Sequence, residues 1–481
     1  MRRRLVFFWI GFLAAPVLNA QSFSLGDYLQ EVKTQGPDYR SQAAEVEGDE
    51  KQSHQGDLTY SPILTAGFNH QDDESIQSSF LAPDRTLSDT AGVSITDLLP
   101  FGPKLTIGYD FDNVNIAYPS QLLSSFGSYA SDFLTSYYQI SPVISLSIPL
   151  FKDFGGAQTG AGVKKVQYQF EAAAQSAAFQ REGELYNAKL AYWNLELARQ
   201  AVAIRQDTLK RTQKIWDWTK KQVARNLADP PDALQAEASA RLAELDLDMA
   251  RQQEQSARLL FNRYRGKAVE GVPEHLESLQ DSLDRLRVNP PTSVSRTNRL
   301  DLKAAEDIAR EQKAAYDEAH QNAYPDITAN ASWRGNGLDP AFPTANQEAF
   351  STDHPTYNIG AQFNLPLDVF TASRVVEGYQ KSYESAELAL RDKQLQVNQD
   401  WMDLENKLKD VDQRLGMTAQ IEAIQKRKAD EEKRRLKYGR TTEFQLLSFE
   451  NDYNAARLSH LSVISEKLFL LAQAQWWMAA P

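Results

Sequence analysis

The stretch LTYSPILTAGFNH (residues 58–70) has a counterpart far downstream, QNAYPDITANASW (321–333). In both, a Tyr and a Pro introduce an alternating run that ends in aromatic and polar residues, and a long polar stretch rich in Ala and Glu comes before. A Pro at this position ends a helix and suits the start of an edge strand. The chain therefore repeats one helix-to-strand junction, about 263 residues apart.

Two further pairs of landmarks extend the repeat. LSIPLF (146–151) corresponds to FNLPLD (363–368), and VARNLADPPDALQAE (223–237) corresponds to LKYGRTTEFQLLSFE (436–450). The offsets of the three pairs are 263, 217 and 213 in turn. The sequence therefore predicts two duplicated halves, the first of which carries about 46 extra residues between its strands.

The segments after each junction alternate like strands. Residues 357–365 place Tyr, Ile, Ala, Phe and Leu on one face and Asn, Gly, Gln and Asn on the other. About ten residues of this pattern are enough for a tilted strand of a membrane barrel. An ordinary half-buried sheet shows the same alternation, so the pattern alone leaves both open. A possible hairpin at 92–111 turns at Pro100–Pro103.

Very long helices favour the barrel interpretation. Residues 163–224 contain no Pro and one Gly, and residues 373–438 contain no Pro and two Gly. At 1.5 Å per residue such helices would be about 90–100 Å long, which is typical of coiled coils. Each is followed by a turn and a returning helix with apolar residues at mixed spacings of three and four.

The expected organisation follows from these segments. Residues 1–20 form a signal peptide. Residues 21–265 form a first repeat of a helix, barrel strands (60–150), a long helix (161–225) and a return helix (232–264). Residues 266–298 form a linker, and residues 299–481 a second repeat of a helix, barrel strands (324–367), a long helix (373–438) and a return helix (442–479).

The N-terminus and the composition predict an exported protein. Three Arg precede a short apolar run and the small residues of a cleavage site after Ala20, although a retained membrane anchor is the alternative. The 481 residues contain no Cys, which excludes disulfides and thiolate catalysis, and the net charge of −12 argues against nucleic-acid binding. No other continuous apolar run approaches the length that a membrane-spanning helix needs, about 20 residues.

Closing the expected sheet requires several copies of the chain. Two strands per repeat give about four per chain, which cannot enclose a bore, and open edges are not tolerated in lipid. Three copies would give twelve strands, or up to eighteen if the 92–111 hairpin joins the wall.

In these features the chain resembles the TolC-like outer-membrane efflux proteins over about residues 22–478. The resemblance is carried by the two junctions, SIPLFKDFG (147–155), AYWNLELA (191–198), RLDLKAAE (299–306) and YGRTTEFQLLSFENDYNAA (438–456). It implies an α+β fold: a trimeric, twelve-stranded outer-membrane β-barrel continued by a periplasmic α-helical coiled-coil barrel. It also implies docking to a periplasmic adaptor and an inner-membrane transporter, in tripartite efflux or type I secretion.

The resemblance places the gate at the two periplasmic helical turns. Gly439 and Asn226 occupy positions where a left-handed backbone is expected. Candidate gate residues are Asp229, Asp232, Arg435, Lys437, Arg440 and Gln445, where Gln445 replaces the Asp that the family often has. Candidate adaptor-docking residues are Leu227, Gly439, Arg440 and Thr441. The basic residues could hold the acidic ones in ion pairs, or all could be solvated tip charges worth about 0–1 kcal/mol per pair.

No catalytic, cofactor or metal site is predicted. The six His are scattered, and the glycine-rich stretch GGAQTGAGVKK (155–165) lacks the ending of a phosphate-binding loop. Glycine freedom at a bend between strand and helix explains it better. A passive export duct is the favoured function. The alternative is a structural coiled-coil or adhesin-type surface protein without transport activity.

Overall fold

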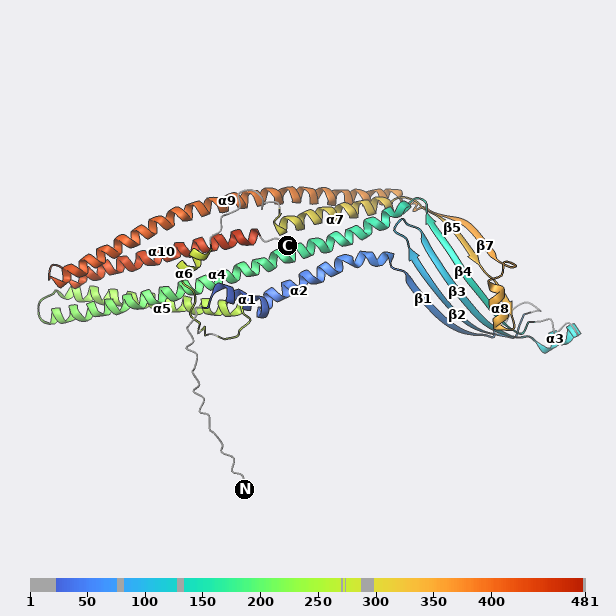
Figure 1. Ribbon diagram of the computed structural model, residues 1–481, viewed down its shortest axis with the longest axis horizontal. Helices are drawn as coiled ribbons and strands as arrows, with labels where there is room; N and C mark the ends of the chain where they lie inside the picture. Colours follow the sequence, from blue (N-terminus) through green and yellow to red (C-terminus); the bar gives the residue numbers. More distant parts are fainter. Residues whose placement is uncertain are drawn as a thin grey trace, which may run out of the picture. The chain divides into compact units, whose positions relative to one another are not determined.

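The computed structural model describes residues 23–75, 82–127, 134–269, 271–272, 274–286 and 298–478, so the expected signal peptide lies outside the described residues. The chain divides into two compact units (Figure 1). One unit comprises residues 1–45, 177–300 and 395–481, and the other comprises residues 46–176 and 301–394. Each unit takes segments from both sequence repeats, because the long helices α4 (Ala157–Ala224) and α9 (Val369–Lys437) contribute to both.

The second unit contains one antiparallel sheet with the strand order β1-β2-β3-β4-β5-β7, and β6 pairs with β4 beside this path. The strands are β1 (Ile63–Asp73), β2 (Arg85–Leu98), β3 (Lys104–Ala117), β4 (Ser136–Pro149), β5 (Asp326–Arg334), β6 (Gly337–Asp339) and β7 (Thr356–Asn364). The expected four strands per chain are therefore too few. The hairpin around 92–111 is longer than its sequence pattern indicated, and both of its strands join the sheet.

Helices flank this sheet. The 3-10 helix η1 (Ser53–Tyr60) follows α2 (Pro37–Gln52) and leads into β1, while α7 (Leu300–Asn322) leads into β5. The first residues of β1 and β5, 63 and 326, are 263 apart, which is the offset of the sequence landmarks. Helix α8 (Phe342–Ala349) packs on the sheet, where Ala345 and Ala349 bury Ile140 completely. Along the chain, helix α3 (Ser120–Phe126) follows β3 and precedes β4.

Glycines form the bend between β4 and α4, as the sequence predicted. Gly155 and Gly156 have φ values of +67° and +74°, a region that residues with a Cβ rarely adopt. A Cβ on Gly156 would lie 2.1 Å from the carbonyl oxygen of Pro100. The 3-10 turn η3 (Phe154–Gly156) can therefore pass close to the β2–β3 turn only because it carries no side chain there.

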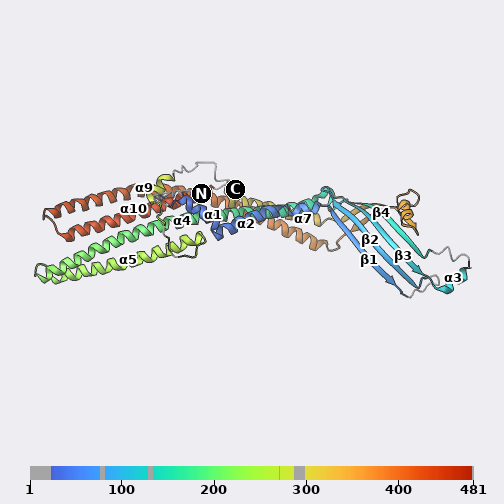
Figure 2. The same cartoon turned by 60° about the horizontal axis from the view of Figure 1, so that its bottom comes forward.

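The first unit is built on two helical hairpins. Helix α4 is followed by α5 (Pro230–Tyr264), and α9 is followed by α10 (Glu443–Trp477), as Figure 2 shows. The helix boundaries at 224, 230 and 264 in the first hairpin correspond to those at 437, 443 and 477 in the second, a constant offset of 213. None of the helices in the described ranges is both long and apolar enough to cross a membrane.

Aromatic side chains form the core of the first unit. Helix α1 (Leu25–Gln35) is capped by Ser24, which accepts a hydrogen bond from the backbone N–H of Asp27. It buries Tyr28 against Tyr192 of α4 and Phe261 of α5, with the Tyr28 and Phe261 rings stacked 4.3 Å apart. Helix α6 (Leu279–Arg285) adds Leu279 to the same cluster.

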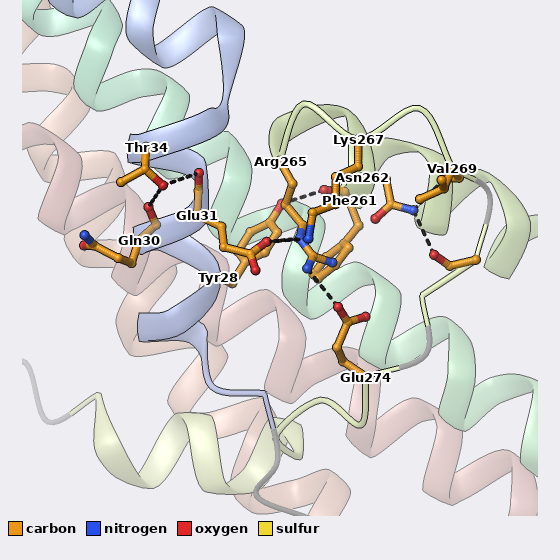
Figure 3. A network of polar contacts seen from close by, with 11 residues as sticks. Tyr28, Gln30, Glu31, Thr34, Phe261, Asn262, Arg265, Lys267, Val269 and Glu274 are labelled. Atoms are coloured by element: carbon orange, nitrogen blue, oxygen red, sulfur yellow. Dashed lines mark hydrogen bonds and ion pairs between the residues drawn. The ribbon is translucent and has the colours of Figure 1, made fainter.

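A buried arginine next to this core joins the end of α5 to α1 and to the segment that contains Glu274 (Figure 3). Arg265, whose side chain is 2% exposed, directly follows α5 and donates to Glu31 of α1 at 2.5 Å and to Glu274 at 2.8 Å. Its guanidinium also lies over the rings of Phe23 and Phe261, 5.0 and 5.1 Å from their centroids. The hydrogen bond from Arg265 lowers the pKa of the Glu31 carboxyl below its ordinary value.

Candidate functional site: the two helical turns

Both helical turns end in the same backbone motif. Asn226 has a φ of +57° and Gly439 a φ of +67°, so both adopt the left-handed conformation that the sequence predicted. The N–H of Leu227 donates to the carbonyl of Gln222, and the N–H of Arg440 donates to the carbonyl of Arg435, each across five residues. This pattern satisfies carbonyl groups at a helix C-terminus. The two turns are therefore equivalent in structure although they differ in sequence.

The acidic gate candidates cap the helix that follows the first turn. Asp229 is the N-cap of α5, Pro230 occupies its first position, and Asp232 is the third residue. The backbone N–H of Asp229 donates to Oδ2 of Asp232 at 3.4 Å. Carboxylates at a helix N-terminus are also stabilised by the helix dipole. Thr442 and Gln445 hold the corresponding places in the second turn, where the Gln445 N–H donates to the Thr442 hydroxyl at 3.2 Å.

The basic gate candidates belong to the second turn. Arg435 forms an ion pair with Glu432 at 3.2 Å, and the hydroxyl of Thr441 also donates to Glu432. Glu432 is only 3% exposed, so it organises this turn from inside. Its role was not predicted, because a Glu within the charged run of residues 426–437 looks like any solvated residue. Lys437 and Arg440 are exposed.

The structure brings part of the predicted set together. A groove of about 640 Å³ lies between the first turn and the beginning of α10. Its lining includes Leu227, Asp229 and Asp232 from the first turn, and Thr442 and Phe444 from the second. Arg435, Lys437, Gly439 and Arg440 are not among the lining residues. In the described part of the chain, no ion pair joins Asp229 or Asp232 to a basic side chain, so the acidic side of the groove is not neutralised within one copy.

Two polar contacts between the hairpins were also missed by sequence reasoning. Arg211 of α4 forms an ion pair with Glu450 of α10 at 2.7 Å, with side chains 29% and 18% exposed. One step along, the buried Asn454 donates to the hydroxyl of Thr208 at 3.0 Å. No sequence motif marks these residues, whose partners are more than 200 positions away. They hold the two hairpins of one copy side by side near their turns.

Within the described residues, no group of three or more His, Asp or Glu side chains is arranged to hold a metal ion. The described fold consists of one antiparallel sheet, two long helical hairpins and their turns. Solved structures of TolC-like outer-membrane channels share this fold.

Comparison with known proteins supports this class. Residues 292–466 match the family described as outer membrane efflux protein, which consists of channels and not of enzymes. No curated protein matches the chain. The match and the shared fold confirm the expected resemblance to the TolC-like efflux proteins.

Solved structures share the fold over nearly the whole chain. The outer membrane protein VceC from Vibrio cholerae is 15% identical with a TM-score of 0.63, covering 95% of this chain and 96% of its own. The open state of the MtrE outer membrane channel of Neisseria gonorrhoeae is 15% identical with a TM-score of 0.64, covering 94% and 88%. The CmeC outer membrane channel of Campylobacter jejuni is 11% identical with a TM-score of 0.63, covering 94% and 85%.

Proposed function

We propose that three copies of this chain form the outer-membrane channel of a tripartite efflux or type I secretion system, a passive duct that cargo leaves through. The observation that carries the proposal is the two-faced part of the sheet: in the rows that pair residues 64–68 of β1 with β2, β3 and β4, mainly apolar rows alternate with mainly polar ones, and β5 and β7 continue the alternation. An apolar face toward lipid and a polar face toward water are what a barrel wall needs.

The sheet edges support assembly from several copies. Strands β1 and β7 end the strand order, and all or nearly all of their residues are exposed. Unpaired edges are not viable in the hydrocarbon region, so the edge of one copy pairs with that of the next. Each helical hairpin carries an exposed apolar stripe. The stripe of the first hairpin lies on α5 (Leu242, Leu245 and Met249), and that of the second lies on α9 (Met417, Ile421 and Ile424). Helices of neighbouring copies would cover these stripes.

Periplasmic partners would dock at the turns. We assign the groove at the first turn and the second turn beside it, including Leu227, Gly439, Arg440 and Thr441, to a periplasmic adaptor coupled to an inner-membrane transporter. The groove joins exposed apolar side chains, Leu227 and Phe444, to two carboxylates. An adaptor segment with apolar and basic residues would complement it.

The same turns would form the gate. Three copies would bring six carboxylates from Asp229 and Asp232 to the constriction, while the second turn has the uncharged Thr442 and Gln445 at the equivalent positions. Arg435, Lys437 and Arg440 are the cations that could reach this ring from an adjacent copy. Arg435 would have to leave Glu432 to do so.

The second turn suggests how to test the gate without disturbing the fold. Asp229→Thr together with Asp232→Gln gives the first turn the same N-cap pair that the second turn uses. We expect the double variant to lose only the helix-dipole stabilisation of the two carboxylates, about 1 kcal/mol, which lowers the Tm by about 2–4 °C. We also expect it to lose cation preference in planar bilayers. Unchanged ion selectivity would reject the acidic gate.

The duct itself is tested by the purified protein. We expect a heat-modifiable trimer that conducts ions across planar bilayers and co-purifies with an adaptor encoded beside its gene. A stable trimer without conductance would reject the duct and favour the structural coiled-coil or adhesin-type alternative.

A further inference from the structure

Strands β2 and β3 carry the same two-faced pattern as the other strands. On one face the register aligns Ala66, Val93, Tyr109 and Pro142, and one row along it aligns Leu64, Ile95, Ile107, Ile144 and Trp333. On the other face it aligns Thr65, Ser94, Gly108 and Val143. The apolar face therefore continues across the hairpin without a break, and the polar face continues with one Val among small residues.

Exposure agrees with the pattern. Val93 and Ile95 of β2 are each 50% exposed, and Ile107 of β3 is 52% exposed, compared with 45% for Ile144 of β4. About half of each of these side chains is therefore open to the surroundings, although all four belong to strands paired on both sides. Apolar side chains this exposed in the middle of a sheet need a nonpolar environment outside the chain.

Charged residues limit the apolar band on β2. Asp89 lies on the apolar face at one end, where it contacts His70 at 2.6 Å, and Asp97 lies on the same face at the other end. The eight-residue step between them spans about 27 Å along the strand, or about 20 Å across a membrane at a tilt of about 40°. This is close to the height of the apolar band of outer-membrane barrels, about 25 Å.

We infer that the β2–β3 hairpin is part of the membrane wall, so that three copies close a barrel of eighteen strands rather than the twelve that the resemblance implies. The inference rests on the proposed trimeric channel. Six long strands of each copy contribute to the wall, and β1 of one copy pairs with β7 of the next. Removing the hairpin from the wall would require breaking the register of β1 with β2 and of β3 with β4 along their whole lengths.

Eighteen strands make a wide exit. With strands about 4.8 Å apart and tilted by about 40°, the backbone diameter is about 36 Å, against about 24 Å for twelve strands. The polar face consists mainly of Ser, Thr, Asn, Gln and Gly, and one of its carboxylates, Asp110, lies 3.7 Å from Arg334. A bore of this width would pass bulky cargo and would leave selection to the periplasmic turns.

Single cysteines can test the inference, because the chain has none of its own. Val93→Cys and Ser94→Cys probe the two faces of β2. Ala331→Cys and Ser332→Cys are matched controls on β5, which lies in the wall whether it has twelve or eighteen strands. Each variant of the full-length trimer is reconstituted in lipid vesicles and treated with a water-soluble maleimide.

We expect the cysteines at 94 and 332 to react at least tenfold faster than those at 93 and 331. A fluorophore attached at 93 should be quenched by lipids brominated in their acyl chains. Equal reaction at 93 and 94, with the contrast on β5 retained, would place the hairpin outside the wall and overturn the inference alone. Loss of the contrast on β5 as well would overturn the proposed membrane channel. Electron cryo-microscopy of the unaltered trimer gives an independent count, and twelve strands in cross-section would also overturn the inference.

Discussion

Replacing Arg265 by Met should destabilise the helical unit strongly. The guanidinium is 2% exposed and hydrogen-bonds two carboxylates from different segments, Glu31 and Glu274. The variant leaves Glu31 with Lys267 at 2.9 Å, whereas Glu274, whose Oε2 already has no hydrogen-bond partner, loses its ion pair with Arg265. Breaking a buried ion pair by removing one partner costs about 3–5 kcal/mol.

The partial exposure of the two carboxylates reduces this cost. Their side chains are 28% and 27% exposed, so water can solvate them after the guanidinium is gone. We therefore expect a loss of about 2–3 kcal/mol, which lowers the Tm of a unit of this size by about 5–10 °C. Tryptophan fluorescence of the detergent-solubilised protein during heating reports it, because Trp193 and Trp401 are buried in this unit.

Arg263 provides the matched control. It lies two residues earlier and pairs with Asp38 at 3.5 Å, but its side chain is 71% exposed. Arg263→Met should shift the Tm by less than about 2 °C, because exposed pairs contribute about 0–1 kcal/mol. If the two variants melt at the same temperature, the buried arginine does not hold the unit together and the reasoning is wrong.

Three further expectations follow from other contacts. The pKa of Glu31 is lowered in the folded protein, so the stabilisation from its ionised form is present above the ordinary carboxyl pKa and is lost as pH falls. The Tm should therefore drop on acidification. It should drop less steeply in Arg265→Met, because that variant lacks the partner that lowers the pKa of Glu31. Gly156→Ala should prevent the heat-modifiable trimer from forming, whereas Gly155→Ala, with open space around its Cβ position, should cost only about 1–2 kcal/mol. Arg211→Gln should raise the open-to-closed ratio in planar bilayers about fivefold, because it removes a contact between the hairpins worth about 1 kcal/mol; an unchanged ratio would show that the contact plays no part in gating.

The sequence predicts those features that one local segment determines. The Pro62 and Pro325 junctions locate the beginnings of β1 and β5, because a Pro cannot continue the interior of a helix. The left-handed residues Asn226 and Gly439 were predictable for a similar reason, since few residues other than Asn and Gly adopt that conformation at low cost. The chemistry of one residue decides each of these features.

Contacts between distant segments were not predictable. Arg265 and Glu31 are 234 positions apart, and Arg211 and Glu450 are 239 apart, so nothing local distinguishes them from solvated charges. The early part of β2 was missed for a related reason. Its residues Leu87, Asp89 and Ala91 do not make an apolar face by themselves, and pairing with both β1 and β3 determines their conformation.

The geometry of an antiparallel sheet restricts how one repeat can be longer than the other. In an antiparallel sheet each added strand reverses the direction of the chain, so a single extra strand would have sent α4 away from the end of the sheet where α9 begins. Adding the β2–β3 hairpin inserts two strands and restores the direction, so that β4 leads into α4 as β7 leads into α9. The two helical hairpins can therefore keep the same lengths, with boundaries 213 residues apart, although the two repeats have different numbers of strands. An insertion at this place changes the circumference of the wall and leaves the helical turns, where partners would dock, unchanged.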